Sequence, residues 1–234
     1  MPENPIVRAL AQAARARGAE PLLTWYQPET GGRTELSVRT VANWVDKTAN
    51  LLEDLGVTGT VAGPVNVAHP GHWMSLLWPL AAWQHGCGYR AGDPDAGCEL
   101  VVVGPDDPRP HPGLTTLACS LHPLGLGLRD LPAGVLDFSG EALSQPDAHA
   151  AEPVDPSASA WTDEGHDLDH AATGRVAAQA GRVLVRPSTA WATLTDALLG
   201  PLLGGGSAVV VEGTVEPDAL ARLAAAEHVT TPVA

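Results

Sequence analysis

Apolar residues recur at three- and four-residue spacing in several parts of the chain, the pattern of helices with one buried face. The first such helix is predicted over residues 3–18. The clearest one carries an apolar stripe from Val38 to Leu55, begins after Ser37, a residue that caps helices well, and ends at Gly56. The same reasoning predicts three later helices, at 162–179, 191–203 and 216–225.

One further segment, residues 72–85, is apolar on every side and is closed by Gly86. A helix of this kind belongs between layers, and Pro79 inside it is expected to kink it or interrupt its hydrogen bonds. Its three tryptophans are expected to pack in a core. If a missing subdomain left the helix partly exposed, they would instead form an apolar surface for a protein partner or a second copy of the chain. These residues are Trp73, Trp78 and Trp83.

Short runs of branched residues between turn signals predict strands among these helices. The predicted strands cover 21–26, the residues from the Gly31-Gly32 turn to Leu36, 60–68 before a turn at His69-Pro70-Gly71, 99–103, 114–120, 135–138, 182–186, 207–211 and 228–231. Strands alternating with helices favour right-handed crossovers, so the predicted fold class is α/β, with mostly parallel sheets flanked by helices. We expect a single domain over 1–234. Its first part (1–138) and second part (160–234) flank an irregular surface segment at about 139–159, rich in Pro, Ala, Asp and Ser.

Composition narrows the function classes. The net charge is −14 and Lys47 is the only lysine, so the chain is acidic and disfavours nucleic acid and anionic membranes as partners. No apolar run reaches the length of a membrane span, and the N-terminus has no signal pattern, so the sequence indicates a cytoplasmic protein. The three cysteines form no C-x-x-C pair and are expected to be buried free thiols. Abundant Ala, Gly, Pro, Val and Arg suggest a GC-rich genome.

Four stretches of the sequence, in this order, resemble the acyl-adenylate-forming superfamily of AMP-dependent synthetases and ligases. They are 37–57 (SVRTVANWVDKTANLLEDLGV), 65–87 (VNVAHPGHWMSLLWPLAAWQHGC), 182–211 (RVLVRPSTAWATLTDALLGPLLGGGSAVVV) and 217–230 (PDALARLAAAEHVT). The resemblance implies the fold of a truncated N-terminal subdomain of such an enzyme. It is strongest to a short branch that lacks the phosphate loop and the C-terminal subdomain.

The chain departs from that superfamily where the superfamily grips ATP. Its members carry a loop of the form [ST]-[ST]-G-[ST]-T-G-x-P-K, whose amides and lysine hold phosphates. Here the aligned residues read SASAWTDEGHDLDH, with four carboxylates and no lysine. Carboxylates beside a triphosphate repel it, so no family catalytic residue is carried over, no cofactor is predicted, and adenylation is expected to be absent.

Within this region, four residues would share one stripe of the predicted 162–179 helix, and they are the candidate metal ligands: Asp163, His166, Asp167 and His170. Two histidines one turn apart with carboxylates beside them are a pattern that binds divalent ions. The alternative is a solvated helix face, since the apolar residues of the segment fall on the opposite side. No H-E-x-x-H motif supports a metal site, so no metal is predicted.

Two other patterns are interpreted as structural. Gly204-Gly205-Gly206 follows a helix and precedes a strand, whereas a phosphate-binding turn follows a strand and opens a helix. No G-x-S-x-G is present, and the adjacency of His85 and Cys87 in sequence does not make a catalytic pair.

The sequence therefore favours a non-catalytic, degenerate relative of the synthetases, a pseudoenzyme acting as a binding or interaction module. The alternatives are a residual acyl-adenylate- or CoA-ligase-type enzyme working with a partner chain, a small hydrolase or metal-binding protein using the 163–170 stripe, and a regulatory subunit docking on an intact synthetase.

Overall fold

The computed structural model describes residues 2–63 and 71–232. Its helices are α1 (Pro5–Arg17), α2 (Val38–Asp54), α3 (Trp73–Gln84), α4 (Phe138–Leu143), α5 (His170–Thr173), α6 (Ala190–Leu194), the π-helical turn η1 (Thr195–Leu199), α7 (Gly200–Gly204) and α8 (Pro217–Ala226). Its strands are β1 (Pro21–Gln27), β2 (Gly32–Ser37), β3 (Thr60–Ala62), β4 (Gly88–Arg90), β5 (Cys98–Val103), β6 (Thr115–Ala118), β7 (Val135–Asp137), β8 (Ser159–Thr162), β9 (Asp167–Asp169), β10 (Arg182–Val185), β11 (Ser207–Val211) and β12 (Thr231–Pro232). The predicted turn residues His69 and Pro70 lie outside the described ranges.

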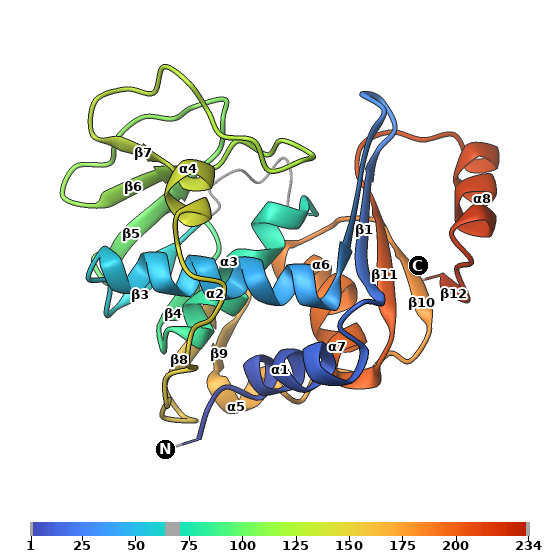
Figure 1. The fold of residues 1–234 in the computed structure, drawn as a ribbon, viewed down its shortest axis with the longest axis horizontal. Helices are drawn as coiled ribbons and strands as arrows, with labels where there is room; N and C mark the ends of the chain where they lie inside the picture. The colour runs from blue at the N-terminus through green and yellow to red at the C-terminus, as the bar shows by residue number, and fades with distance from the viewer. Residues whose placement is uncertain (1, 64–70, 233–234) are drawn as a thin grey trace.

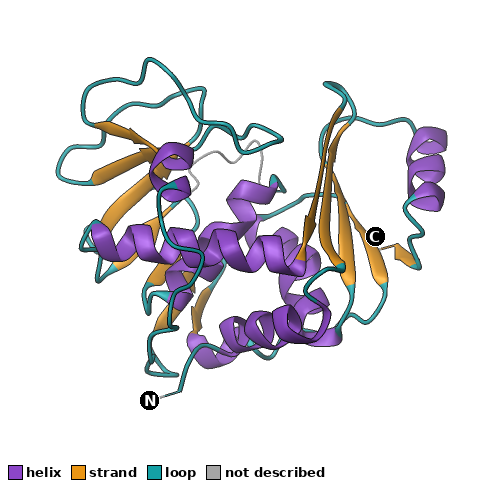
Figure 2. Ribbon diagram, viewed as in Figure 1, coloured by secondary structure: helices purple, strands orange, loops and turns teal. Residues whose placement is uncertain are grey.

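The strands form two sheets, separated by helices (Figures 1 and 2). Sheet A has the order β12-β10-β11-β1-β2, and sheet B has the order β7-β6-β5-β3-β4-β8-β9. The pairings of the described strands are parallel except for β1 with β2 and β8 with β9. The predicted α/β class with mostly parallel, helix-flanked sheets is confirmed. Sheet A pairs the first two strands of the chain, β1 and β2, with its last three, β10 to β12. The strands of sheet B all lie between these two groups in the sequence.

Side-chain caps fix the start of the first two helices. Asn4 accepts hydrogen bonds from the N–H groups of Ile6 and Val7 at the start of α1, and the hydroxyl of Ser37 accepts one from Thr40 in α2. The predicted stripe of α2 is buried from Val38 to Leu52 and packs against α3. The two helices cross the space between the sheets (Figure 1).

Helix α3 is buried along its whole length and is continuous through Pro79. Trp73, Trp78 and Trp83 are all less than 2% exposed, and the indole N–H groups of Trp73 and Trp83 donate to backbone carbonyls at 3.0 and 2.7 Å. An exposed tryptophan surface on α3 is therefore not present in this structure. The core-packing interpretation of these residues is the correct one, because α1, α2 and β4 pack against the helix.

The prediction of a helix over 162–179 is wrong. Residues 159–169 form a β-hairpin, β8–β9, and only His170–Thr173 are α-helical. Strand β8 is held in place by parallel pairing with β4, and such long-range pairing cannot be seen in a local apolar pattern. The segment 139–159 is irregular after residue 143, but its first residues belong to α4, which Asp137 caps.

The helix predicted over 191–203 is present as α6, η1 and α7 in succession. Pro201 has no N–H to donate to the carbonyl of Ala197, and the N–H of Gly200 bonds the carbonyl of Thr195, five residues earlier. Gly205 then ends the helix in the left-handed conformation, at φ 77°. This confirms the interpretation of the glycine run as a helix end and turn.

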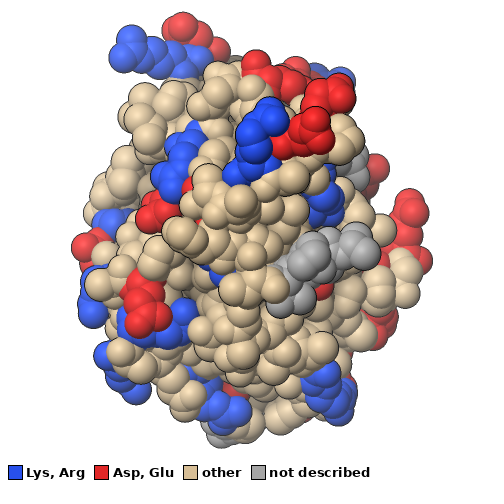
Figure 3. Space-filling view, turned by 90° about the vertical axis from the view of Figure 1, so that its right-hand side faces the viewer, with Lys and Arg blue, Asp and Glu red and all other residues tan. Residues whose placement is uncertain are grey.

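On the side of the molecule that carries sheet A, acidic and basic side chains are intermixed (Figure 3). The net charge of −14 is therefore not concentrated in one acidic patch on that face. None of the helices within 2–63 and 71–232 is long and apolar enough to span a lipid bilayer.

Candidate functional site

The structure separates the four residues that the sequence placed on one helix stripe. Asp163 and His166 face each other across the β8–β9 turn, and Asp163 Oδ1 lies 2.9 Å from His166 Nδ1. Asp167 is exposed on β9, where it accepts a hydrogen bond from Ser159. His170 is 1% exposed and its Nδ1 lies 2.9 Å from the amide nitrogen of Asn4.

These positions exclude the stripe as a common ligand set. Across the residues that the structure describes, no group of three or more His, Cys, Asp or Glu side chains is arranged to hold a metal ion. The three cysteines are buried free thiols. Burial raises the pKa of Cys87 to about 12, with a smaller contribution from Glu99, so this thiol is protonated at neutral pH and is a poor nucleophile.

The carboxylate of Asp163 organises the β8–β9 turn. It accepts hydrogen bonds from the indole N–H of Trp161 at 2.9 Å and the backbone N–H of Gly165 at 2.7 Å, in addition to the contact with His166. Partial burial acts to raise the pKa of Asp163, but these hydrogen bonds outweigh it and hold the pKa below its ordinary value. The group is therefore ionised at neutral pH.

Asp163 and His166 line a cavity with a volume of about 930 Å³. The cavity lies outside the carboxyl ends of β3, β4 and β8, the edge of a parallel sheet where ligands of α/β proteins bind. Helix α3 and the loop from β10 into α6 form its other walls. The lining residues are Gly63, Ser75, Leu76, Pro79, Tyr89, Arg90, Ala91, Gly92, Asp93, Trp161, Asp163, Glu164, Gly165, His166, Ser188, Thr189, Ala190 and Leu194.

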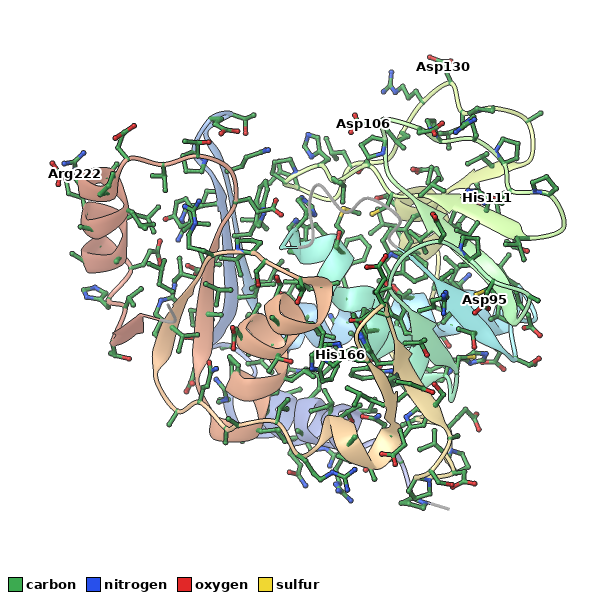
Figure 4. All side chains as sticks on the ribbon, turned by 180° about the vertical axis from the view of Figure 1, so that it is seen from behind. Asp95, Asp106, His111, Asp130, His166 and Arg222 are labelled. Atoms are coloured by element: carbon green, nitrogen blue, oxygen red, sulfur yellow. The ribbon has the colours of Figure 1, made fainter. Side chains whose placement is uncertain are left out.

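His166 marks the position of this cavity in the molecule (Figure 4). It lies near the centre, between sheet B and the helices that cover sheet A, and its ring packs on Trp191 of α6 with centroids 5.9 Å apart. Asp106 and Asp130 lie at the outer end of sheet B, and Arg222 lies at the opposite end of the molecule. The cavity is thus formed where the two halves of the fold meet.

The inner end of the cavity is aromatic and apolar, with two hydroxyl groups. Tyr89 stacks on Trp161 at 5.4 Å, and Trp161 packs on Trp191 at 5.1 Å. Ser75 and Tyr89 are 4% and 1% exposed, and neither hydroxyl oxygen has a hydrogen-bond partner among the described residues. Burial raises the pKa of Tyr89 well above its ordinary value, so the phenol keeps its proton and can donate or accept.

The outer end of the cavity carries excess negative charge. Asp93 and Glu164 are exposed at its rim, and Asp163 lies just inside. Among the described lining residues Arg90 is the one arginine or lysine, and it is already engaged, since it donates to the carbonyl of Asp93 at 2.9 Å and pairs with Asp95 at 3.1 Å. The arrangement suits a neutral or cationic ligand and opposes a polyphosphate.

The sequence identified only two residues of this site, Asp163 and His166, and placed them on the wrong element. It did not single out Ser75, Tyr89 or Trp161, which come from α3, β4 and β8; Tyr89 and Trp161 become neighbours only when β4 and β8 pair in register. One signal in the sequence could have located the site. Residues 157–170 align with the phosphate loop of the superfamily, and in the structure they include the carboxyl end of β8.

Comparisons with known proteins agree with the fold described above. The fold is that of part of an acyl-CoA synthetase: the solved structure of an acyl-CoA synthetase from Brucella canis superposes with a TM-score of 0.72 over 98% of this chain, at 18% sequence identity. The chain spans only 46% of that protein's length. No family model matches the sequence.

A curated protein has a higher sequence identity to this chain than that structure has. A TIGR03089 family protein of Mycobacterium tuberculosis (strain ATCC 25618 / H37Rv) is 32% identical over 231 residues, which cover 92% of both chains. The chain belongs to the TIGR03089 family.

Proposed function

We propose that this protein binds a small organic molecule in the cavity at the junction of its two sheets and does not adenylate it. The proposal joins two features of the site. A cavity of about 930 Å³ is large enough for a metabolite-sized ligand, and its lining combines an apolar, aromatic interior with a few polar groups.

The observation that carries the proposal is the acidic character of the β8–β9 turn. A nucleotide-activating enzyme needs backbone amides, a lysine or a metal ion aimed at the phosphates. Here the turn carries the acidic side chains of Asp163 and Glu164, and the N–H of Gly165 already donates to Asp163. The only lysine, Lys47, does not line the cavity and pairs with Asp147 at 2.6 Å.

A residual ligase remains the second candidate, because the chain has the fold of part of an acyl-CoA synthetase. In that case a partner chain would have to supply the cations that neutralise the triphosphate. A metal-binding protein using Asp163, His166, Asp167 and His170 is not favoured, because only the first two of these residues are neighbours.

ATP–pyrophosphate exchange tests the proposal. The purified protein is incubated with ATP, magnesium, labelled pyrophosphate and a panel of carboxylic acids, beside an authentic acyl-CoA synthetase. We expect no exchange above the rate without protein. Steady exchange that scales with protein concentration would refute the proposal and favour the ligase.

A further inference from the structure

We propose that the cavity is selective for a cationic amine carried on an aromatic body, and that it discriminates against the corresponding carboxylic acid. This inference rests on the proposed binding function and adds the chemical class of the ligand. It is argued from three features of the cavity: the charge at its rim, the aromatic walls and the two buried hydroxyl groups.

The charge at the rim determines the sign of the charge that a bound ligand carries. Asp93, Asp163 and Glu164 are set against Arg90, whose guanidinium already contacts Asp95. Asp163 stays ionised, because three hydrogen bonds from the protein stabilise its carboxylate. An ammonium group entering here gains attraction from three carboxylates, whereas a carboxylate group meets repulsion.

The walls set the shape of the ligand body. Tyr89 and Trp161 line the cavity and stack on each other, and Trp161 also packs on Trp191, which does not line it. Leu76, Pro79 and Leu194 line the space beside the two rings. A planar ring packs well against aromatic walls, and a cation next to them is further stabilised by the ring faces. The aromatic part of the ligand would lie inside, with its amine at the rim.

The two hydroxyl groups indicate that a polar atom reaches the inner end. A buried hydroxyl without a partner is costly, and most buried polar groups in proteins are satisfied. Ser75 Oγ and the Tyr89 hydroxyl are both in this state among the described residues, and both residues line the same cavity. A ligand with an N–H or O–H on its ring system would satisfy them.

Three probes with one ring system and different head groups test this inference: tryptamine, tryptophol and indole-3-acetate. Each carries an indole N–H for the inner hydroxyl groups. Isothermal titration calorimetry on the full chain should give the tightest binding for tryptamine, about 10-fold or more tighter than indole-3-acetate, with a difference that shrinks as salt is added. Equal or tighter binding of the acid, or no saturable binding of tryptamine at millimolar concentrations, would overturn it.

Variants separate the two ends of the cavity. Asp93→Asn with Glu164→Gln removes charge from exposed side chains, so we expect tryptamine to bind about 2- to 10-fold more weakly and tryptophol to be unaffected. Tyr89→Phe keeps the ring and should weaken tryptamine and tryptophol alike, about 3- to 10-fold. Asp106→Asn with Asp130→Asn is the matched charge control, because it also removes two exposed carboxylates and both residues lie at the outer end of sheet B (Figure 4).

The outcomes also separate this inference from the function on which it rests. If Asp106→Asn with Asp130→Asn weakens the binding of tryptamine as much as the rim variant does, or if Tyr89→Phe has no effect on either probe, the assignment of the amine to this cavity is wrong. Binding of the acid without ATP–pyrophosphate exchange would refute the amine selectivity and leave the non-adenylating function standing. ATP–pyrophosphate exchange by the purified protein would refute the proposed non-adenylating function.

Discussion

The side chains of Asn4 and His170, 166 residues apart in the sequence, meet at 2.9 Å in the interior of the protein. The amide nitrogen of Asn4 donates to Nδ1 of the imidazole and lies 3.2 Å from the hydroxyl of Thr173, while its carbonyl oxygen caps α1. One side chain thus ties the first helix to the segment that follows the β8–β9 hairpin. His170 has a structural role here, because its buried ring holds the side chain of Asn4.

Substitution of Asn4 is expected to destabilise the whole fold. Asn4→Ala removes the cap of α1 and leaves His170 Nδ1 without its donor, which should lower the free energy of unfolding by about 1–3 kcal/mol. Urea denaturation followed by circular dichroism measures this. Arg8→Ala on the exposed face of α1 is the control and should change stability by less than about 0.5 kcal/mol. Equal effects of the two variants would contradict the role given to Asn4.

The buried imidazole also predicts a dependence of stability on pH. Burial lowers the pKa of His170, against the weaker attraction of Asp169 and Asp155, so the unfolded chain binds a proton more readily than the folded one. The neutral imidazole makes its full contribution to the free energy of unfolding at pH values above 6.5, its pKa in the unfolded chain. This contribution is lost as the pH falls through the lower pKa of the folded state.

We expect His170→Gln, which keeps an acceptor for Asn4, to reduce the loss of stability between about pH 7 and pH 5. His149, whose pKa is also lowered, mainly by burial, contributes with the same sign and accounts for part of the remaining slope. Urea denaturation over this range measures the slope, and His111→Gln at the outer end of sheet B is the control. Identical slopes for wild type and His170→Gln would be inconsistent with a buried neutral His170.

Much of the fold could be predicted from local patterns. The helix after Ser37, the buried helix around Trp78 and the strand that became β5 all carry strong periodicity or a continuous apolar run, and all are present. The division into two sheets could not be predicted, because β1 pairs with β11 across almost the whole chain. Such long-range pairing depends on tertiary contacts that no local window contains.

The candidate site was harder to predict for the same reason. Residues 162–179 carry a weak helical pattern, yet Trp161 and Thr162 continue a strand that β4 holds in register, and Gly165 allows the turn back to β9. Asp163 and His166 are two of the four residues of the predicted helix stripe, but the geometry that joins them is a turn. The residues of the inner cavity, including Tyr89, come from elements distant in sequence and carry no motif.

The separation of the four candidate ligands predicts how the protein responds to zinc. Asp167 lies on the exposed side of β9 and His170 is buried beside Asn4, so neither completes a site with Asp163 and His166. We expect purified protein to contain no stoichiometric zinc, and neither added zinc nor a chelator to shift the unfolding temperature. Metal analysis and a thermal melt measure this. A rise in the unfolding temperature that depends on His166 and His170 together would contradict the structure.

Asp163 is expected to determine the stability of the β8–β9 turn. Asp163→Ala leaves the indole of Trp161, the N–H of Gly165 and His166 without their acceptor, which should cost about 1–3 kcal/mol of unfolding free energy. Asp163→Asn keeps an oxygen and should cost less. Asp167→Ala, four residues on and exposed, should change stability by under about 0.5 kcal/mol.

The acid dependence of these variants gives an independent check on the charge of Asp163. Because the folded pKa of Asp163 is lowered, its carboxylate stabilises the fold fully above the unfolded value of 3.8, and this is lost as the pH falls through the folded pKa. Urea denaturation should therefore show a constant difference between wild type and Asp163→Asn from neutral pH down to about pH 4, and a narrowing one below it. A difference that disappears already between neutral pH and about pH 5 would mean that burial, and not the three hydrogen bonds, dominates the titration of this carboxylate.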